Sequence, residues 1–140
     1  MKKALVIYHS KTGITRKLGH EIGIACYQNN LQTEIISIYE FSKDVLEGVD
    51  YIFLGCWTHG LMILLQHPEQ HWVKFANSLP ALNSKKIVLF TTYKLATGSM
   101  FKNMRKHIHC ESSDIVLEIK SRNGNLQESD VFRLKSIITS

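Results

Sequence analysis

A short segment near the amino terminus has the residue types of an anion-binding turn. Residues 9–16 place three hydroxyl side chains around one glycine and contain no carboxylate. Backbone N–H groups at the start of a helix are unpaired and carry partial positive charge, so they attract a phosphate group. Ser10, Thr12 and Thr15 add neutral donors, and Gly13 lets the chain pass close to the anion. The segment therefore predicts a phosphate site, with an ordinary helix cap as the alternative.

Other phosphate-handling motifs are absent from the sequence. Neither the P-loop pattern G-x-x-x-x-G-K-[ST] nor the dinucleotide pattern G-x-G-x-x-G occurs. A response-regulator receiver needs acidic residues after its first strand and an aspartate after its third. Residues 9–10 and 55–56 stand at those positions, and none of them is acidic. The chain is therefore none of these three kinds of protein.

Two further segments offer an aromatic side chain directly after an apolar run. Trp57 lies in residues 55–60, of sequence GCWTHG, and Tyr93 lies in residues 91–98, of sequence TTYKLATG. Stacking on an aromatic ring contributes about 0.5–1.5 kcal/mol beyond the burial of area. These segments can therefore present flat apolar faces to a planar ligand.

Five apolar runs alternate with helical patterns along the chain. The runs predict strands over residues 4–8, 34–38, 51–56, 86–91 and 115–119. Helical spacing predicts helices over residues 14–26, from a first turn at Pro68 to Leu79, over 99–109, and around 131–138. This alternation implies right-handed crossovers and a parallel sheet. We therefore expect one α/β domain over residues 1–140, a three-layer αβα doubly wound sheet of five strands in the order 2-1-3-4-5. Ligands of such sheets bind beyond the carboxyl ends of the strands, where the three segments above would meet.

Composition excludes several other classes of protein. The 140 residues are 44% hydrophobic and 21% charged, which is typical of a globular chain rather than a disordered or fibrous one. The longest apolar runs, such as 52–56 and 61–65, are far shorter than the ~20 residues of a membrane span. The apolar run after Met1 is too short for a secretion signal, and the three cysteines form no C-x-x-C pair. We therefore expect a cytoplasmic protein with buried thiols and no membrane span.

The charge balance points to an anionic ligand or an acidic partner. The chain has 17 Lys and Arg against 12 Asp and Glu, for a net charge of +5. No run of basic residues exceeds two, and no stripe of alternating aromatic and basic residues occurs. We therefore expect no nucleic-acid partner.

Three sets of reactive side chains are set aside. His67 and His71 are four residues apart, but Pro68 replaces the glutamate of H-E-x-x-H. His107, His109 and Cys110 have no fourth ligand nearby. A nucleophilic pair of Cys56 with His59 is less favoured than a buried thiol. No catalytic or metal-binding residue is therefore predicted.

The segment from Val6 to Thr15 resembles the phosphate loop of the flavodoxin family, which has the form T/S-x-T-G-x-T after an apolar strand. The order of strands and helices resembles that family over nearly the whole chain. The resemblance implies the cofactor FMN, with its phosphate held by the hydroxyls of Ser10, Thr12 and Thr15 and by the amides of residues 11–15, which include those of Lys11, Gly13 and Ile14.

The resemblance also implies that the two aromatic segments sandwich the flavin ring. Tyr93 packs on one face, and the family's second stacking residue falls nearest His59, with Trp57 two residues earlier, so that either covers the other face. The carbonyl of Gly60 would accept the proton on flavin N5. The remaining residues expected around the ring come from the same segments: Thr58, Thr91, Thr92, Lys94 and Gly98.

This chain departs from the family in its charge. Flavodoxins are usually acidic, whereas Lys11, Arg16, His59 and Lys94 lie in the loops and no carboxylate does. We therefore expect a reduced flavin that is easier to form than in acidic members, and an acidic redox partner. The resemblance implies an electron carrier that is a monomer or a weak homodimer. An FMN-dependent oxidoreductase stays open, of the quinone reductase or protoporphyrinogen oxidase kind, with residues 61–65 walling a substrate pocket. A flavin-free interaction module also stays open.

Overall fold

A parallel sheet lies at the centre of the molecule, and its strands coincide with the apolar runs of the sequence. The computed structural model describes the backbone of residues 1–61 and 64–140, and the side chains of that part except at 60–65. The strands that form the parallel sheet are β1 (Lys3–His9), β2 (Gln32–Ser37), β3 (Tyr51–Leu61), β5 (Lys86–Thr92) and β6 (Ile115–Ser121). Their order is β2-β1-β3-β5-β6. The doubly wound order expected from the sequence is therefore confirmed.

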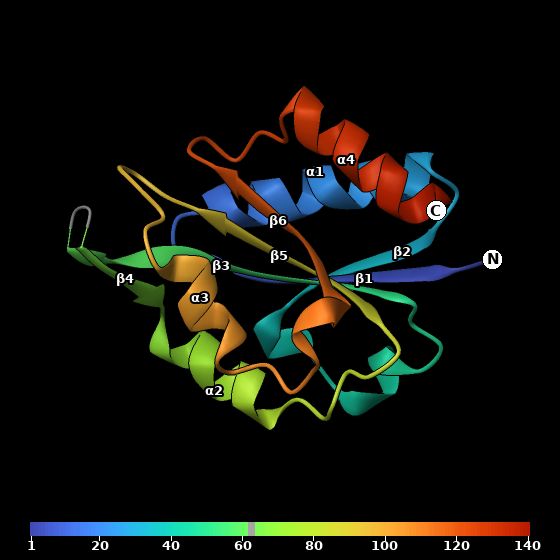
Figure 1. The fold of residues 1–140 in the computed structure, drawn as a ribbon, viewed down its shortest axis with the longest axis horizontal. Coiled ribbons are helices and arrows are strands. Elements are labelled where there is room, and N and C mark those ends of the chain that lie inside the picture. The colour runs from blue at the N-terminus through green and yellow to red at the C-terminus, as the bar shows by residue number, and fades with distance from the viewer. Residues whose placement is uncertain (62–63) are drawn as a thin grey trace.

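Helices cover both faces of the sheet and give the molecule three layers. Helices α1 (Ile14–Gln28) and α4 (Glu128–Thr139) lie on one face, and α2 (Gln70–Ser78) and α3 (Met100–Arg105) lie on the other (Figure 1). Two buried apolar clusters follow from this arrangement, one on each face. The cluster under α1 and α4 contains Phe53 and Phe90. The cluster under α2 and α3 contains Trp72 and Leu54.

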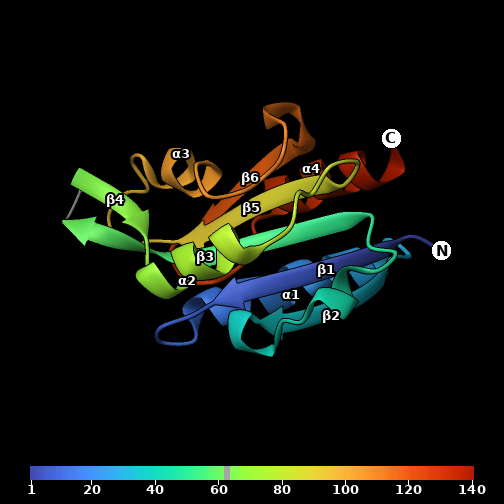
Figure 2. The ribbon, with the colours of Figure 1, turned by 90° about the horizontal axis from the view of Figure 1, so that it is seen from below.

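A sixth strand is the main difference from the expected fold. Strand β4 (Leu64–Pro68) pairs antiparallel with the end of β3, so the described residues form a sheet of six strands rather than five. Figure 2 shows this hairpin extending beyond the sheet at the end where β1 points. The expected strand 51–56 therefore continues to Leu61, and residues 57–60 lie in a strand rather than a loop. The aromatic and hydroxyl residues 57–59 favour a strand once β4 supplies its hydrogen-bond partners.

Pro68 ends β4 instead of opening a helix, which corrects the expectation for this residue. Helix α2 begins two residues later, at Gln70. The Glu69 side chain caps α2 by accepting a hydrogen bond from the backbone N–H of His71. A carboxylate at this position satisfies an unpaired amide and complements the helix dipole.

Two other elements end earlier than expected, each for a local reason. Ser37 and Glu40 form a capping box that turns Ile38 into a short 3-10 helix, so β2 stops at Ser37. Helix α3 covers residues 100–105 rather than 99–109. The amides of His107 and Ile108 bond to carbonyls three residues back and tighten the chain after α3. Among the described residues, no helix is both long and apolar enough to span a bilayer.

Candidate functional site

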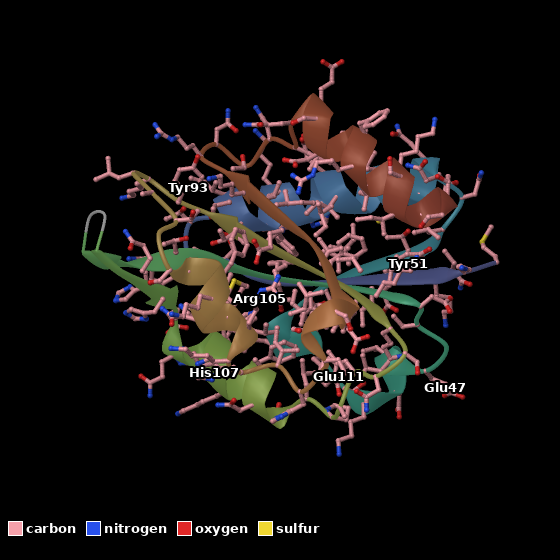
Figure 3. The ribbon with its side chains drawn as sticks, in the orientation of Figure 1. Glu47, Tyr51, Tyr93, Arg105, His107 and Glu111 are labelled. Atoms are coloured by element: carbon pink, nitrogen blue, oxygen red, sulfur yellow. The ribbon has the colours of Figure 1, made fainter. Side chains whose placement is uncertain are left out.

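A cavity of about 650 Å³ lies at the carboxyl end of the parallel strands. It is bounded by the segment after β1, the β3–β4 hairpin and the segments after β5 and β6. Figure 3 shows Tyr93 at this end of the sheet, with Tyr51 at the opposite end. Its size is in the range of small-molecule and cofactor sites. The residues that line it are Lys11, Thr12, Ile14, Thr15, Trp57, Thr58, His59, Gln66, Thr92, Tyr93, Lys94, Leu95, Ala96 and Arg122.

The turn before α1 lines one part of this cavity and contains unpaired amides. Gly13 is the N-cap of α1 with φ of 95°, a left-handed conformation that favours glycine. Ser10 Oγ accepts a hydrogen bond of 3.0 Å from the Gly13 amide, which holds the turn closed. Within the described part of the chain, the amides of Ile14, Thr15 and Arg16 have no hydrogen-bond partner. These donors and the positive end of the helix dipole can bind an anion.

Thr15 and Thr92 form a buried pair of hydroxyls at the edge of the cavity. Their Oγ1 atoms are 2.6 Å apart, and Thr15 is only 1% exposed. Because one hydroxyl donates to the other, the acceptor keeps its own proton for a further hydrogen bond. In the described structure neither hydroxyl has another partner. Both residues line the cavity, so the pair can donate one hydrogen bond to a ligand.

Thr58 and Thr91 form a second hydroxyl pair, which offers the cavity a hydrogen-bond acceptor rather than a donor. Thr91 Oγ1 donates to the carbonyl of Cys56 over 2.6 Å, and the Thr58 and Thr91 hydroxyl oxygens are 2.8 Å apart. Since the Thr91 proton is committed to the carbonyl, Thr58 must donate to Thr91. Only Thr58 of this pair lines the cavity, and it offers lone pairs there. This position can accept a hydrogen bond from the edge of a ligand.

Aromatic side chains from two elements line the cavity. Trp57 is half-buried in β3, its ring 5.1 Å from the His59 ring, and Lys11 Nζ lies 5.0 Å from the Trp57 ring centre. Tyr93 follows β5, with the guanidinium of Arg122 5.4 Å from its ring centre. Such cation–π contacts orient the rings. The cavity thus has flat apolar surfaces from two elements.

The charge in the cavity lining is all positive. Lys11, Lys94 and Arg122 contribute cations, and no carboxylate lines the described cavity. Arg16, which the sequence pattern grouped with these cations, is exposed and lies outside the lining. Arg122 takes its place, and it donates a hydrogen bond of 3.4 Å to the carbonyl of Leu95. An anionic ligand would therefore meet attractive cations here and no repelling carboxylate in the described lining.

Ten of the fifteen residues expected to contact a cofactor line this cavity, and four others, all described, do not. Ser10 and Gly13 form the turn before α1, and Thr91 hydrogen-bonds to the Thr58 hydroxyl. Gly98 has φ of 49° and lies against the side chain of Gln66. Gly60 belongs to β3, but its surroundings, like the expected pocket wall at 61–65, fall outside the described side chains.

Four lining residues were missed by sequence reasoning. Gln66 comes from the unexpected strand β4, and Leu95 and Ala96 follow Lys94 in the segment after β5. Arg122 follows β6, a segment that no motif singled out. The carboxyl end of β6 is at the same sheet edge as the others, so position in the fold was the available signal.

The thiol and histidine sets considered from the sequence have other surroundings or partners in the structure. Burial raises the pKa of the Cys56 thiol to about 12, and the residue is fully buried. The His67 ring contacts the His59 ring and donates to the Pro68 carbonyl, so it is not paired with His71. Two histidines, His107 and His109, instead hydrogen-bond to Asn77.

One family model matches most of this chain, and the solved structures below are similar to it in fold. A model of the flavodoxin domain matches residues 5–129. No curated protein sequence matches the chain. The two-electron reduced flavodoxin of Megasphaera elsdenii is similar in structure with a TM-score of 0.71 and 18% identity, over 96% of this chain and 97% of that one.

Two further solved structures have the same fold. Oxidised flavodoxin 2 from Bacillus cereus has a TM-score of 0.68 and 18% identity, over 98% of this chain and 95% of that one. The rubredoxin:oxygen oxidoreductase of Desulfovibrio gigas has a TM-score of 0.69 and 12% identity, over 99% of this chain but 35% of that one. The same fold thus occurs both as a whole flavodoxin and as part of a longer chain.

Proposed function

This chain belongs to the flavodoxin family, and we propose that it is an electron carrier that holds FMN in the cavity at the carboxyl end of its sheet. FMN is the cofactor that membership of the family implies. One observation carries the proposal: the unpaired amides of Ile14 and Thr15 and the Thr15–Thr92 hydroxyl pair belong to residues that line a cavity with no carboxylate among its described lining.

The turn before α1 fits the phosphate of FMN. A phosphomonoester carries close to two negative charges and several acceptor oxygens at neutral pH. The amides of residues 14–16, the hydroxyl of Thr12 and the Thr15–Thr92 pair would supply its donors. Lys11 adds a positive charge beside the same turn. Ser10 acts through the Gly13 amide, as a residue that positions the turn.

The aromatic residues and Thr58 fit the ring of FMN. Tyr93 and the pair Trp57 and His59 would cover its faces, and Thr58 would accept a hydrogen bond at its edge. FMN, when bound, supplies one- and two-electron redox chemistry, whereas the protein supplies binding, orientation and surrounding charge. The cations Lys94 and Arg122 favour the anionic, fully reduced form of the cofactor.

The same cations support an acidic redox partner. Lys11, Lys94 and Arg122 are exposed residues at the cavity, where a partner must approach to exchange electrons. Complementary surface charges raise association rates, and added salt reduces this effect. The partner would therefore present carboxylates around its own redox centre.

The experiment that tests the proposal combines a spectrum with an electron-transfer assay. We expect the freshly purified protein to have the visible absorption of a bound flavin. After reduction, it should pass electrons to an acidic one-electron acceptor faster at low ionic strength than at high ionic strength. A colourless protein that takes up no FMN would favour the interaction module instead.

A second candidate function is supported by the β3–β4 hairpin. The hairpin adds His59 and Gln66 to the cavity lining, so a small substrate could be enclosed beside the ring. An FMN-dependent oxidoreductase would need such a wall. Steady-state turnover of a quinone with NAD(P)H would favour this enzyme over a carrier, and transfer limited to protein acceptors would favour the carrier.

A further inference from the structure

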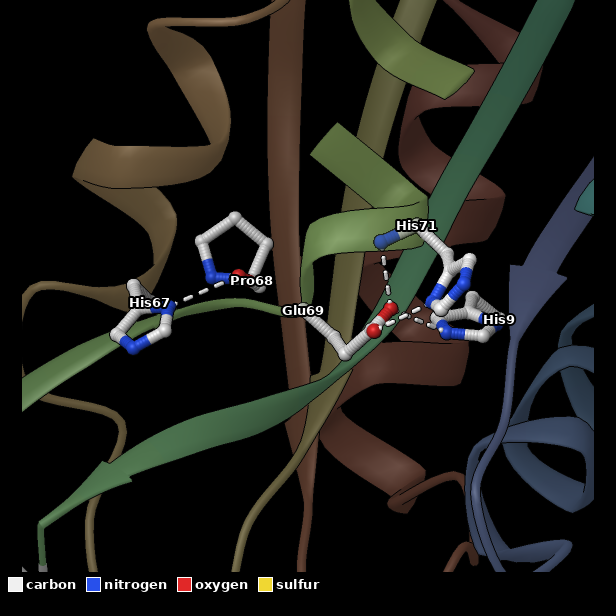
Figure 4. Close-up of polar contacts among 5 residues, drawn as sticks. All are labelled: His9, His67, Pro68, Glu69 and His71. Atoms are coloured by element: carbon white, nitrogen blue, oxygen red, sulfur yellow. Dashed lines mark hydrogen bonds and ion pairs between the residues drawn. The ribbon is translucent and has the colours of Figure 1, made fainter. Parts of the chain in front are cut away.

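Two histidines from distant parts of the chain converge on one carboxylate outside the flavin cavity. His9 ends β1, Glu69 caps α2, and His71 lies in the first turn of α2. His9 Nε2 is 2.7 Å from Glu69 Oε2, and His71 Nδ1 is 2.6 Å from Glu69 Oε1 (Figure 4). None of the three residues lines the cavity described above. The cluster therefore needs an explanation of its own.

Helix capping accounts for only part of this arrangement. A cap at α2 requires a single acceptor, and Glu69 Oε2 meets that need through the backbone N–H of His71 at 2.7 Å. Capping requires neither the His71 ring nor a histidine 60 residues away on β1. Both imidazoles nevertheless direct a ring nitrogen at the carboxylate. Three potential ligand atoms, one from each residue, thus lie within 4.8 Å of one another.

The cluster is held firmly on one side and is open to water on the other. The side chains of His9 and Glu69 are 10% and 19% exposed, whereas that of His71 is 62% exposed. The Tyr39 ring flanks both histidines, with its centre 5.8 Å from that of His9 and 6.4 Å from that of His71. An ion could enter from the His71 side without disturbing the core.

We propose that His9, Glu69 and His71 bind a divalent transition-metal ion of the zinc class. Two imidazole nitrogens and one carboxylate oxygen form a known three-residue zinc set, which leaves a fourth position to water. Zinc–nitrogen and zinc–oxygen distances are about 2.0–2.2 Å, so ligand atoms already this close need only small side-chain rotations to surround an ion. The ion would replace the protons that now bridge each imidazole to the carboxylate.

Metal binding at this cluster does not depend on flavin binding, although the two sites are close in sequence. His9 directly precedes Ser10, the first residue of the turn before α1. The ligand set lies on the side of the strand ends that α2 covers, whereas the cavity is lined by residues of α1 and the hairpin. Zinc affinity can therefore be measured whether or not FMN is present.

Titration of the full-length protein, as purified, with zinc chloride tests the proposal. Isothermal calorimetry and competition with a chromophoric chelator should both report one ion per chain. His71→Ala and Glu69→Gln should each weaken Zn²⁺ binding at least about tenfold, because each removes or alters one ligand of three. The Glu69→Gln variant keeps a side-chain oxygen that can cap α2, and His71 is exposed, so the two variants complement each other if one folds poorly. Millimolar Mg²⁺ should not compete, since it prefers all-oxygen sites.

His20→Ala is the matched control, because His20 is an exposed histidine on α1 whose ring contacts Tyr8. It should bind Zn²⁺ as the parent protein does. Absence of stoichiometric binding would overturn the proposal. So would a folded His71→Ala or Glu69→Gln variant with unchanged affinity, or loss of binding in His107→Ala with His71→Ala unaffected.

Discussion

The hydroxyl oxygens of Thr15 and Thr92 lie 2.6 Å apart, although 77 residues separate the two threonines along the chain. This contact joins the first turn of α1 to the end of β5. It also leaves one hydroxyl proton available to donate to a ligand, since only one of the two protons is used in the bond between the hydroxyls. The proposed phosphate end of the site is thus built from two elements rather than from the glycine turn alone.

Removing the Thr15 hydroxyl should weaken FMN binding but not riboflavin binding. Thr15→Val keeps the shape of the side chain and deletes its hydrogen bond, and bonds to charged groups contribute about 1.5–3 kcal/mol. We therefore expect the Kd for FMN to rise roughly 10- to 100-fold in a fluorescence titration. The Kd for riboflavin, which lacks the phosphate, should change little. Thr139→Val, at the exposed end of α4, is the control. An equal loss for both flavins would show that Thr15 acts through the fold.

Neutralising Lys94 should make the bound flavin harder to reduce fully. The cation lines the cavity and, with FMN bound there as proposed, would stabilise the negative charge of the reduced cofactor. An exposed charge about 8 Å away contributes roughly 0.5 kcal/mol in water and more at lower dielectric, and about 1.4 kcal/mol corresponds to 59 mV for one electron. Lys94→Gln should therefore lower the potential of the second reduction by roughly 20–60 mV in a dye-equilibrated titration. Lys43→Gln, beyond the cavity lining, should leave it unchanged. A rise in potential for Lys94→Gln would contradict the electrostatic argument.

The three cysteines should differ sharply in reactivity. Burial raises the pKa of Cys26 and of Cys56 to about 12, so at pH 8 only about one thiol in 10⁴ is ionised. Cys110 is only partly buried, and its pKa is raised less strongly by its burial and by Asp114. A disulfide reagent at pH 8 should thus label one thiol per folded chain, and Cys110→Ser should abolish this labelling. Labelling of a second thiol before unfolding would argue against the buried positions.

Two glycine substitutions should have opposite effects on stability. A Cβ at Gly55 would lie 2.0 Å from Cε2 of the buried Phe90 ring on the neighbouring strand. Gly55→Ala should therefore lower the free energy of unfolding by about 1–3 kcal/mol, the usual cost of overpacking. At Gly19, inside α1, the nearest atom is 3.5 Å away. Gly19→Ala should raise the free energy of unfolding by up to about 1 kcal/mol through helix propensity. Urea titrations of the flavin-free variants measure both values.

The parallel sheet could be predicted because its strands are buried on both faces. Continuous apolar runs such as residues 4–8 and 86–91 fit strands of this kind, and helical patterns separate them. The turn before α1 could also be predicted, since its hydroxyls and glycine are adjacent in sequence. These features depend on neighbouring residues, which a single sequence displays.

The β3–β4 hairpin could not be predicted in the same way. Gly55 and Gly60 suggested a loop, whereas Gly55 is a strand residue that makes room for Phe90. Strand propensity at 57–59 became decisive only when β4 paired with it. Arg122 and the His9–Glu69–His71 cluster were missed because their members meet only in the folded chain.

Calorimetric titration of the flavin-free chain with FMN, and separately with riboflavin, tests the central claim most directly. We predict one FMN per chain, bound at least about tenfold more tightly than riboflavin, because the amides of α1 and the Thr15–Thr92 pair bind the phosphate. No uptake of FMN, or equal affinity for the two flavins, would contradict this claim.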